Sequence, residues 1–341
     1  MIAALAAVAL ALAAAPSDDQ LAGARVITGF SGHRPPAALR RMIEAGEVSG
    51  VILFHGNAGS QRAVRRLTAE LQAIPRPAAV SEPLLITVDQ EGGLVRRLPG
   101  PPRPSAQAIG ARGSRYAGSL GRATGRSLRS MGVNVDLAPV LDLGRPGHAI
   151  AEQHRTFARS PEGVIARGVA FARGLAAAGV AATAKHFPGL GGARLDTDNA
   201  VQRVRLPAAK LRNADERPFA SFAQAGGAMV MLSTAIYPAI SGLPAAFSPE
   251  IATGELRDRL GFQGVSITDA LGTVSAHAFG GPGRSAVAAA AAGSDLVLFT
   301  DLRQAARAER SLSAALSGGS LDRRESEQSV NRVLALRGSL P

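Results

Sequence analysis

Short apolar runs alternate along the chain with longer amphipathic stretches. Eight of these runs are rich in Val, Ile, Leu and Ala and lack polar alternation, as is typical of parallel strands covered on both faces. They predict strands over residues 25–30, 51–55, 84–89, 133–138, 179–185, 228–233, 264–269 and 295–300. No internal repeat, low-complexity tract or long polar linker interrupts residues 20–341.

Helix-like segments lie between the predicted strands. In the stretch 58–73, for example, Val64, Leu67 and Leu71 recur at helical spacing and would face a core. The other predicted helices cover residues 39–43, 116–131, 161–177, 213–225, 249–260, 284–292 and 302–316. Each predicted strand is thus paired with a helical stretch.

Eight strand–helix units predict a single α/β domain over residues 21–341, with the architecture of a (β/α)8 TIM-type barrel. A doubly wound parallel sheet is the structural alternative. It would usually have fewer strands, and no Gly-x-Gly-x-x-Gly fingerprint opens the first unit.

The N-terminus carries a separate signal. Residues 2–15 are almost entirely Ala, Leu, Val and Ile, a stretch shorter than the roughly 20 apolar residues of a membrane-spanning helix. It resembles the apolar region of a signal peptide, with alanines before Pro16 as a cleavage zone. Because a basic leading segment is missing, a buried helix or a mis-assigned start is the alternative. We predict a signal peptide over residues 1–20 and export to the periplasm, cell wall or exterior.

The amino-acid composition excludes several kinds of site and partner. The 341 residues contain no cysteine and no tryptophan, which excludes disulfides, thiolate metal sites and a cysteine nucleophile. Lys+Arg is 38 against Asp+Glu 26, a formal net charge of +12, and all but two of the basic residues are arginine. A coding bias would also produce a chain so rich in Arg and Ala. The sequence has no dense run of basic residues and few aromatic residues among them to stack on bases. We therefore expect no nucleic-acid partner.

Polar residues gather at the carboxyl ends of the predicted strands, where the active site of a barrel lies. Asp269 ends a buried run, a place that suits a nucleophile or a general base and equally a helix-capping Asp. Lys185 and His186 would bind ligand hydroxyl groups or local backbone carbonyls. The other strand-end residues are His55, Asp89, Glu91, Asp136, Asp142, Ser233 and Asp301.

Motifs for other chemistries are missing. The sequence has no Gly-x-Ser-x-Gly elbow, no His-Glu-x-x-His and no Walker-type loop, and its six histidines lack metal-ligand spacing. We therefore expect neither a metal nor a cofactor. The remaining carboxylates, arginines and Lys–His pair favour glycoside chemistry, in which two acids flank the scissile bond.

Several segments match one family pattern. Residues 89–97 read Asp-Gln-Glu-Gly-Gly-Leu-Val-Arg-Arg, and residues 185–189 read Lys-His-Phe-Pro-Gly. Further matches lie at 138–143, 155–157 and 262–271. Through these motifs, nearly the whole chain resembles glycoside hydrolase family 3, specifically the single-domain bacterial β-N-acetylglucosaminidases of cell-wall recycling.

This resemblance implies a role for each matching residue. Asp269 falls on the retaining nucleophile, which forms the covalent glycosyl-enzyme. Five further positions fall where the family binds the terminal sugar: Asp89, Arg97, Arg155, Lys185 and His186.

The acid/base segment departs from the family pattern. The family reads Lys-His-Phe-Pro-Gly-His-Gly and later Asp-Ser/Thr-His, whereas here Leu190 replaces the later histidine of the first motif and Asp198 that of the second. A surface Asp has a pKa near 3.9, so Asp198 would need burial or a neighbour such as Asp196 to act as an acid. Either Asp198, with Asp196, replaces the acid/base, or the protein is a sugar-binding pseudoenzyme.

The resemblance also implies the substrate, a terminal β-linked N-acetylglucosamine of muropeptides or chitin oligosaccharides. The lack of tryptophan argues against a long aromatic platform and favours a pocket for one terminal sugar. A retaining β-glycosidase for another sugar is a further alternative. We expect a monomer without a transmembrane segment, whose positive charge associates with an anionic cell wall.

Overall fold

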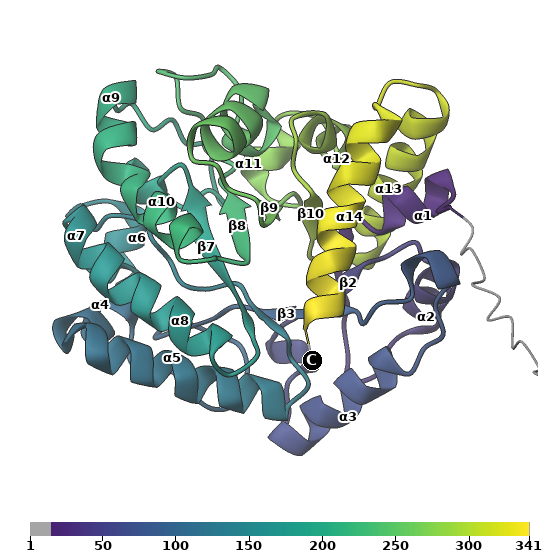
Figure 1. The fold of residues 1–341 in the computed structure, drawn as a ribbon, viewed down its shortest axis with the longest axis horizontal. Helices are drawn as coiled ribbons and strands as arrows, with labels where there is room; N and C mark the ends of the chain where they lie inside the picture. The colour runs from purple at the N-terminus through teal and green to yellow at the C-terminus, as the bar shows by residue number, and fades with distance from the viewer. Residues whose placement is uncertain (1–14, 341) are drawn as a thin grey trace, which may run out of the picture.

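The computed structural model describes residues 15–340, so residues 1–14 of the predicted signal peptide lie outside the described part of the chain. Within it, eight parallel strands close into a barrel, in which each strand pairs with the next and the last pairs with the first (Figure 1). The strands are β1 (Val26–Gly29), β2 (Gly50–Leu53), β3 (Leu85–Val88), β6 (Val135–Asp136), β7 (Ala181–Phe187), β8 (Met229–Leu232), β9 (Val265–Ala270) and β10 (Leu296–Phe299). The predicted (β/α)8 barrel is confirmed, and closure of the sheet rules out the doubly wound alternative.

Helices cover the outside of the barrel (Figure 1). The longer ones are α2 (Ala37–Ala45), α3 (Gln61–Gln72), α5 (Gly113–Ser130), α8 (Ala170–Ala176), α10 (Arg217–Gln224), α12 (Pro282–Ala291) and α13 (Leu302–Ser317). Shorter helices are α4 (Ala106–Ala111), α6 (Ala149–Glu152), α7 (Pro161–Val164), α9 (Ala208–Lys210) and α11 (Val274–His277). Wider π-type turns form η3 (Ile165–Val169), η5 (Leu211–Asp215) and η7 (Glu250–Arg259). Tighter 3₁₀ turns form η1 (His55–Asn57), η2 (Ala78–Val80), η4 (Leu190–Gly192) and η6 (Ala245–Phe247).

Side-chain caps set where several helices begin. Ser60 Oγ accepts from the backbone N–H of Ala63 at the start of α3. Asp301 accepts from the first N–H groups of α13, which satisfies donors that a helix start otherwise leaves unpaired. This strand-end carboxylate therefore has a capping role.

The barrel interior is filled by buried aliphatic side chains from all eight strands. They include Ile27, Ile52, Leu85, Val135, Ala181, Met231, Ile267 and Leu298. A second and larger cluster joins the outer faces of the strands to the surrounding helices. Because every strand is covered on both faces, the strands show the continuous apolar runs seen in the sequence.

One long helix was not predicted from the sequence. Helix α14 (Arg323–Ser339) lies across the barrel, and its Val333 joins the interior cluster (Figure 1). Asp295, just before β10, accepts from Ser329 Oγ at 2.6 Å and from Arg332 Nη2 at 2.7 Å. The helix thus closes the amino-terminal end of the barrel and leaves the opposite end free for a site.

The predicted end of the signal peptide, residue 20, falls within a helix that packs against the barrel domain. Helix α1 (Asp18–Gly23) is capped by Ser17, buries Leu21, and accepts hydrogen bonds from α13 through Asp18 and Asp19. A boundary at residue 20 would divide this helix, whereas cleavage directly before Pro16 would leave it whole. No helix between residues 15 and 340 is long and apolar enough to cross a membrane.

Candidate functional site

A pocket of about 310 Å³ opens at the carboxyl ends of the barrel strands. Its volume is at the lower end of the range for small-ligand sites and suits a single sugar ring. All eight predicted site residues line it: Asp89, Arg97, Arg155, Lys185, His186, Asp196, Asp198 and Asp269. Of the other strand-end residues, Glu91 also lines it, whereas His55, Ser233 and Asp301 do not.

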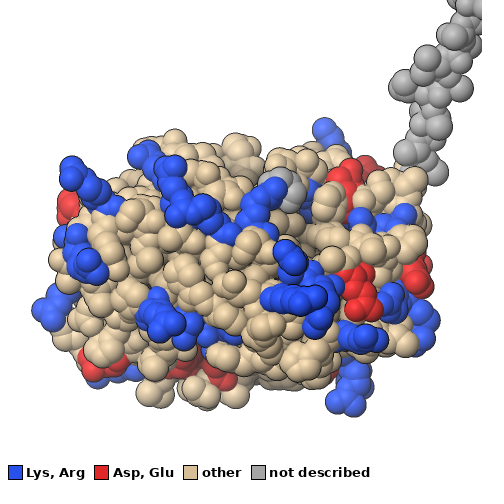
Figure 2. All heavy atoms as spheres, turned by 90° about the horizontal axis from the view of Figure 1, so that it is seen from below, with Lys and Arg blue, Asp and Glu red and all other residues tan. Residues whose placement is uncertain are grey.

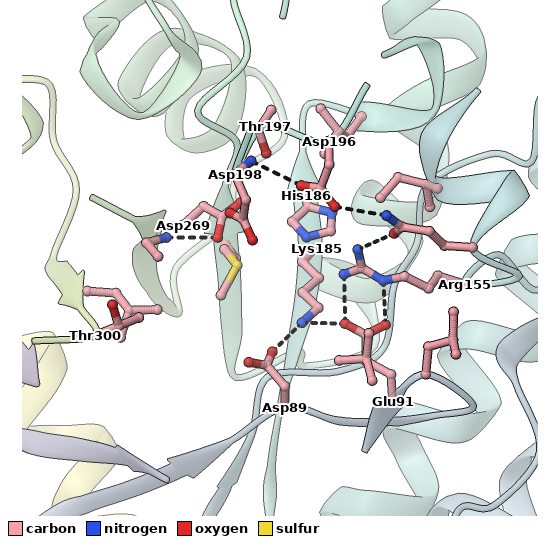
Figure 3. A pocket seen from close by; sticks show the side chains of 18 of the residues that line it. Asp89, Glu91, Arg155, Lys185, His186, Asp196, Thr197, Asp198, Asp269 and Thr300 are labelled. Atoms are coloured by element: carbon pink, nitrogen blue, oxygen red, sulfur yellow. Dashed lines mark hydrogen bonds and ion pairs between the residues drawn. The ribbon is translucent and has the colours of Figure 1, made fainter. Parts of the chain in front are cut away.

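Glu91 is the centre of a buried ion-pair network on one wall (Figure 3). Its two oxygens accept from Arg155 Nε and Nη2, each at 2.8 Å, in a bidentate pair. Lys185 Nζ lies 2.6 Å from both Glu91 Oε1 and Asp89 Oδ1. Burial alone would raise the pKa of Glu91, but Arg155 and Lys185 outweigh it and lower that pKa to about 2. The wall therefore presents fixed charges to a ligand.

The same carboxylates keep the buried cations charged. Burial disfavours a charged lysine, yet Asp89 and Glu91 raise the pKa of Lys185 above its ordinary value. The pKa of Arg155 is raised in the same way by Glu91. We expect Lys185 and Arg155 to donate to sugar hydroxyl or amide oxygens.

A short hairpin carries Arg97 to the pocket. Strands β4 (Gln90–Gly92) and β5 (Val95–Arg96) form it, and it was not among the predicted strands. Gly92 has φ +101°, and a Cβ there would lie 2.3 Å from the Pro104 oxygen, so glycine is required. Arg97 Nε is buried and has no hydrogen-bond partner among residues 15–340. Arg97 itself lines the pocket, so its guanidinium group is placed beside a ligand.

Lys185 and His186 are adjacent in β7, yet both line the pocket. Neighbouring residues of a regular strand face opposite sides, but the pairing of β7 with β8 shifts register between Lys185 and Phe187. Asp142 Oδ2 lies 2.8 Å from His186 Nδ1 and fixes the orientation of the imidazole. Asp142 also accepts from the backbone N–H of Leu190 at 2.6 Å. It is therefore a positioning residue for this wall.

Asp269 lies at the end of β9, on the opposite wall of the pocket (Figure 3). It is half-buried, and its Oδ1 accepts from the backbone N–H of Ala270 at 2.8 Å. This is the one hydrogen bond of this side chain within residues 15–340, which leaves Oδ2 available to a reacting atom. Asp269 thus lies at the carboxyl end of a barrel strand.

The Asp196–Asp198 loop brings a second carboxylate to Asp269 (Figure 3). Asp196 accepts from the Asp198 backbone N–H at 3.0 Å and from Gln153 Nε2 at 2.8 Å. Although burial opposes ionisation, these bonds lower the pKa of Asp196. Burial, together with the negative charges of Asp269 and Asp196, raises the pKa of Asp198 to about 6. Of the two loop carboxyls, Asp196 and Asp198, it is therefore Asp198 that is suited to carry a proton.

Helix α11 holds the Asp196–Asp198 loop in place. The buried Ser275 Oγ lies 2.7 Å from the Thr197 carbonyl oxygen and 2.8 Å from that of Ala200. The Val274 backbone N–H donates to the Asp198 carbonyl. Because α11 follows β9 after a short turn, the segment from β9 to α11 both carries Asp269 and holds the loop of Asp198.

We expect Ser275→Ala to lower kcat about tenfold or more while leaving KM nearly unchanged. The substitution removes the hydroxyl that holds the loop, and small displacements of a reacting group cost up to about 10²-fold in rate. The matched control is Ser285→Ala, a buried serine of α12 that bonds the Ala276 carbonyl and not the loop. Steady-state kinetics of both variants test this, and equal losses in the two would contradict a positioning role for Ser275.

Asp136 is a buried carboxyl beside this network. Its Oδ1 accepts from the Gln90 backbone N–H at 3.0 Å, whereas its Oδ2 has no partner among residues 15–340. Burial raises the pKa of Asp136 to about 8. The fold therefore favours the neutral carboxyl at neutral pH.

We expect Asp136→Asn to remove a pH dependence of stability. In the wild type, the folded state binds the Asp136 proton more tightly than the unfolded chain, so stability falls as pH rises from about 4 to about 8. Relative to the variant, the wild-type free energy of unfolding should fall by up to about 1.4 kcal/mol per pH unit. Denaturant unfolding at pH 5 and pH 8 measures this, with the exposed Asp258→Asn as control. A pH-independent difference would contradict the raised pKa.

Three residues beyond the predicted set contribute to the site. The sequence places Glu91 and Asp142 at strand ends, and Glu91 also lies in the Asp-x-Glu-Gly-Gly segment. Gln153, which bonds both Arg155 and Asp196, gave no sequence signal. Within residues 15–340, no group of three or more metal-ligating His, Cys, Asp and Glu side chains is arranged to hold a metal ion.

Comparisons with known proteins match this architecture. The glycosyl hydrolase family 3 N-terminal domain matches residues 16–336. A protein of Arthroderma benhamiae named "uncharacterized secreted glycosyl hydrolase" is 38% identical, covering 94% of this chain and 93% of its own length. A β-hexosaminidase of Stenotrophomonas maltophilia is 36% identical, covering 80% of this chain and 82% of its own.

Solved structures agree with these sequence matches. The family 3 β-N-acetylglucosaminidase of Paenibacillus sp. is similar with a TM-score of 0.90 at 36% identity, over 95% of this chain. The chain spans less than two thirds of that protein, 63% of its length. A β-N-acetylhexosaminidase of Beutenbergia cavernae has a TM-score of 0.88 at 31% identity, covering 95% of this chain and 99% of its own.

Proposed function

The chain belongs to glycosyl hydrolase family 3, and we propose that this glycoside hydrolase is a retaining β-N-acetylglucosaminidase that releases one terminal sugar at a time. The observation that carries the proposal is the pair of carboxyls, Asp198 and Asp269, at one wall of a pocket sized for one sugar ring. The names of the similar β-hexosaminidases and β-N-acetylglucosaminidases support the choice of sugar.

In the first step, Asp269 attacks the anomeric carbon and forms a covalent glycosyl ester. The bond from that carbon to the leaving-group oxygen breaks, and Asp198 transfers its proton to this oxygen. A pKa of about 6 leaves Asp198 largely protonated at mildly acidic pH, as a general acid requires.

In the second step, the ionised Asp198 takes a proton from water while the water oxygen attacks the anomeric carbon. The ester bond to Asp269 breaks, the carboxylate is restored, and the β configuration is retained after two inversions. Asp196, whose pKa is lowered, stays ionised and orients the loop through the Asp198 N–H.

The sugar is held by the opposite wall in this proposal. Lys185 and Arg155 donate to hydroxyl or acetamido oxygens, Asp89 accepts from hydroxyl groups, and the Arg97 guanidinium supplies a further donor. His186, oriented by Asp142, completes the set. Because the pocket holds about 310 Å³, it fits one ring and favours cleavage from chain ends.

Hydrolysis of a chromogenic β-N-acetylglucosaminide between about pH 4 and 8 tests this function. We expect turnover with a mildly acidic optimum, and proton NMR should detect the β-anomer as the first product. First release of the α-anomer would contradict retention. Binding of N-acetylglucosamine without turnover would favour the sugar-binding pseudoenzyme, which the replacement of the family histidine by Asp198 makes the second candidate. Faster turnover of another glycoside in a panel would reassign the sugar.

We further propose that the barrel is exported as a monomer after removal of its apolar leader. The leader pattern and the printed name of the secreted Arthroderma relative support export. N-terminal sequencing of the mature protein should begin at or near Pro16, which keeps Ser17 and helix α1 intact.

The substrates we propose are muropeptides or chitin oligosaccharides of a cell wall.

A further inference from the structure

We propose that a groove on the outer surface of the barrel binds a linear polyol-phosphate polymer, separately from the catalytic pocket. The groove has a volume of about 720 Å³ and lies between α5, η3, α8 and α10. Arg115 and Arg122 of α5 line one wall, and Arg173 of α8 lines the other. No Asp, Glu or aromatic side chain is among its lining residues.

The three arginines have unused donors. All are exposed, and none takes part in an ion pair among residues 15–340. The floor between them is made of small residues because α5 and α8 approach closely. A Cβ at Gly174 would lie 2.4 Å from the Gly118 oxygen. The result is a hollow with arginines on two walls and small residues such as Gly118, Ala170 and Gly174 between them.

The sequence around the groove is also basic and lacks acidic residues. Between Glu91 and Asp136 the chain has no acidic residue. The arginines of this stretch are Arg96, Arg97, Arg103, Arg112, Arg115, Arg122, Arg126 and Arg129. A coding bias would account for arginine in place of lysine at these positions, but it would not remove acidic residues.

Figure 2 shows the face formed by the lower elements of Figure 1, where α3, α5 and α8 lie. Basic side chains are spread across it, and acidic ones are few and near its edges. Arg126 and Arg129 continue the row of Arg115 and Arg122 along α5, and the positions from Arg115 to Arg129 span about 21 Å of the helix. A row of this length fits a chain of repeated anions better than a single small anion.

The groove also discriminates among polyanions. A tetrahedral phosphate directs its oxygens out of one plane, so one group can accept from guanidinium groups on both walls. Without aromatic side chains the groove offers no stacking platform for nucleic-acid bases. The exposed large apolar residues Leu94, Leu195, Val201, Leu243 and Val274 all lie outside α5, α8 and α10, so these three helices present no such residue to a lipid surface. A flexible polyol phosphate meets these conditions.

Binding of a fluorescent poly(glycerol phosphate) chain to the full-length protein tests the proposal. The test variant combines Arg115→Gln, Arg122→Gln and Arg173→Gln. The control combines Arg303→Gln, Arg307→Gln and Arg324→Gln, exposed residues of α13 and α14 that remove the same charge elsewhere. Thermal unfolding of each variant checks the fold without depending on hydrolase activity.

We expect the groove variant to raise Kd at least about tenfold, and the control variant to change it by less than about twofold. The slope of log Kd against log salt should also fall by about two for the groove variant, since each lost phosphate contact removes about 0.7. Equal weakening in both variants would show that net charge alone drives binding and would overturn the proposal. Absence of polymer binding at physiological salt, or tighter groove-dependent binding of duplex DNA or anionic vesicles, would also overturn it.

Discussion

Asp269→Asn is expected to abolish hydrolysis of β-N-acetylglucosaminides, with kcat lowered about 10⁴-fold or more. An amide lacks the anionic oxygen that attacks the anomeric carbon, so the glycosyl ester does not form. The substitution conserves size, and the Asn oxygen can still accept from the Ala270 N–H. We therefore expect N-acetylglucosamine to bind with nearly unchanged affinity, measured by calorimetry.

The matched control is Asp301→Asn. Asp301 also follows a barrel strand, but it caps α13 and does not line the pocket. Asparagine caps a helix about as well as aspartate, so this substitution should change stability little and leave kcat unchanged. If Asp269→Asn kept a tenth or more of the wild-type kcat, Asp269 would not be the nucleophile.

Asp198→Asn is expected to lower kcat/KM about 10²–10⁴-fold for substrates with a poor leaving group, such as a chitin disaccharide. An aryl glycoside with a good leaving group needs less proton transfer in the first step, so its glycosylation should be affected far less. Comparison of the two substrates therefore separates acid catalysis from a general loss of folding. Equal losses on both would contradict the acid role.

The pH dependence gives an independent test of the same residue. Wild-type kcat/KM should fall about tenfold per pH unit above pH 6, because Asp198 must be protonated to act as the acid and its pKa is about 6. This fall of kcat/KM above pH 6, the alkaline limb of the pH profile, should disappear in Asp198→Asn. Asp198→His should move the limb towards the ordinary histidine pKa of about 6.5 and lower the maximum. A histidine variant more active than the wild type would mean that Asp198 is a lost catalyst.

The barrel could be predicted because its strands are buried on both faces and read as unbroken apolar runs. The polar residues that follow the strands could be placed at one rim, because the carboxyl ends of parallel strands share one end of a barrel. Helix α14 was missed because most of its side chains are polar, and only a few, such as Val333 and Leu336, pack against the barrel. The β4–β5 hairpin was missed because its strands are only two and three residues long.

The chemistry of the site depended more on three-dimensional contacts than on residue types. Glu91 can be identified by its motif, but its bidentate pair with Arg155 joins residues 64 positions apart. The same holds for Asp142 and His186, which are 44 positions apart. The proton affinity of Asp198 depends on its burial beside Asp269, which no local pattern indicates.

The most direct test of the roles of Asp269 and Asp198 is to trap the covalent intermediate in Asp198→Asn with an activated aryl β-N-acetylglucosaminide. Without its general base, the variant should hydrolyse the glycosyl ester slowly and accumulate it. Peptide mass spectrometry of the quenched protein should then place one N-acetylhexosaminyl group on Asp269, and added azide should discharge it. An adduct on another residue, or undiminished turnover without any adduct, would contradict the proposed mechanism.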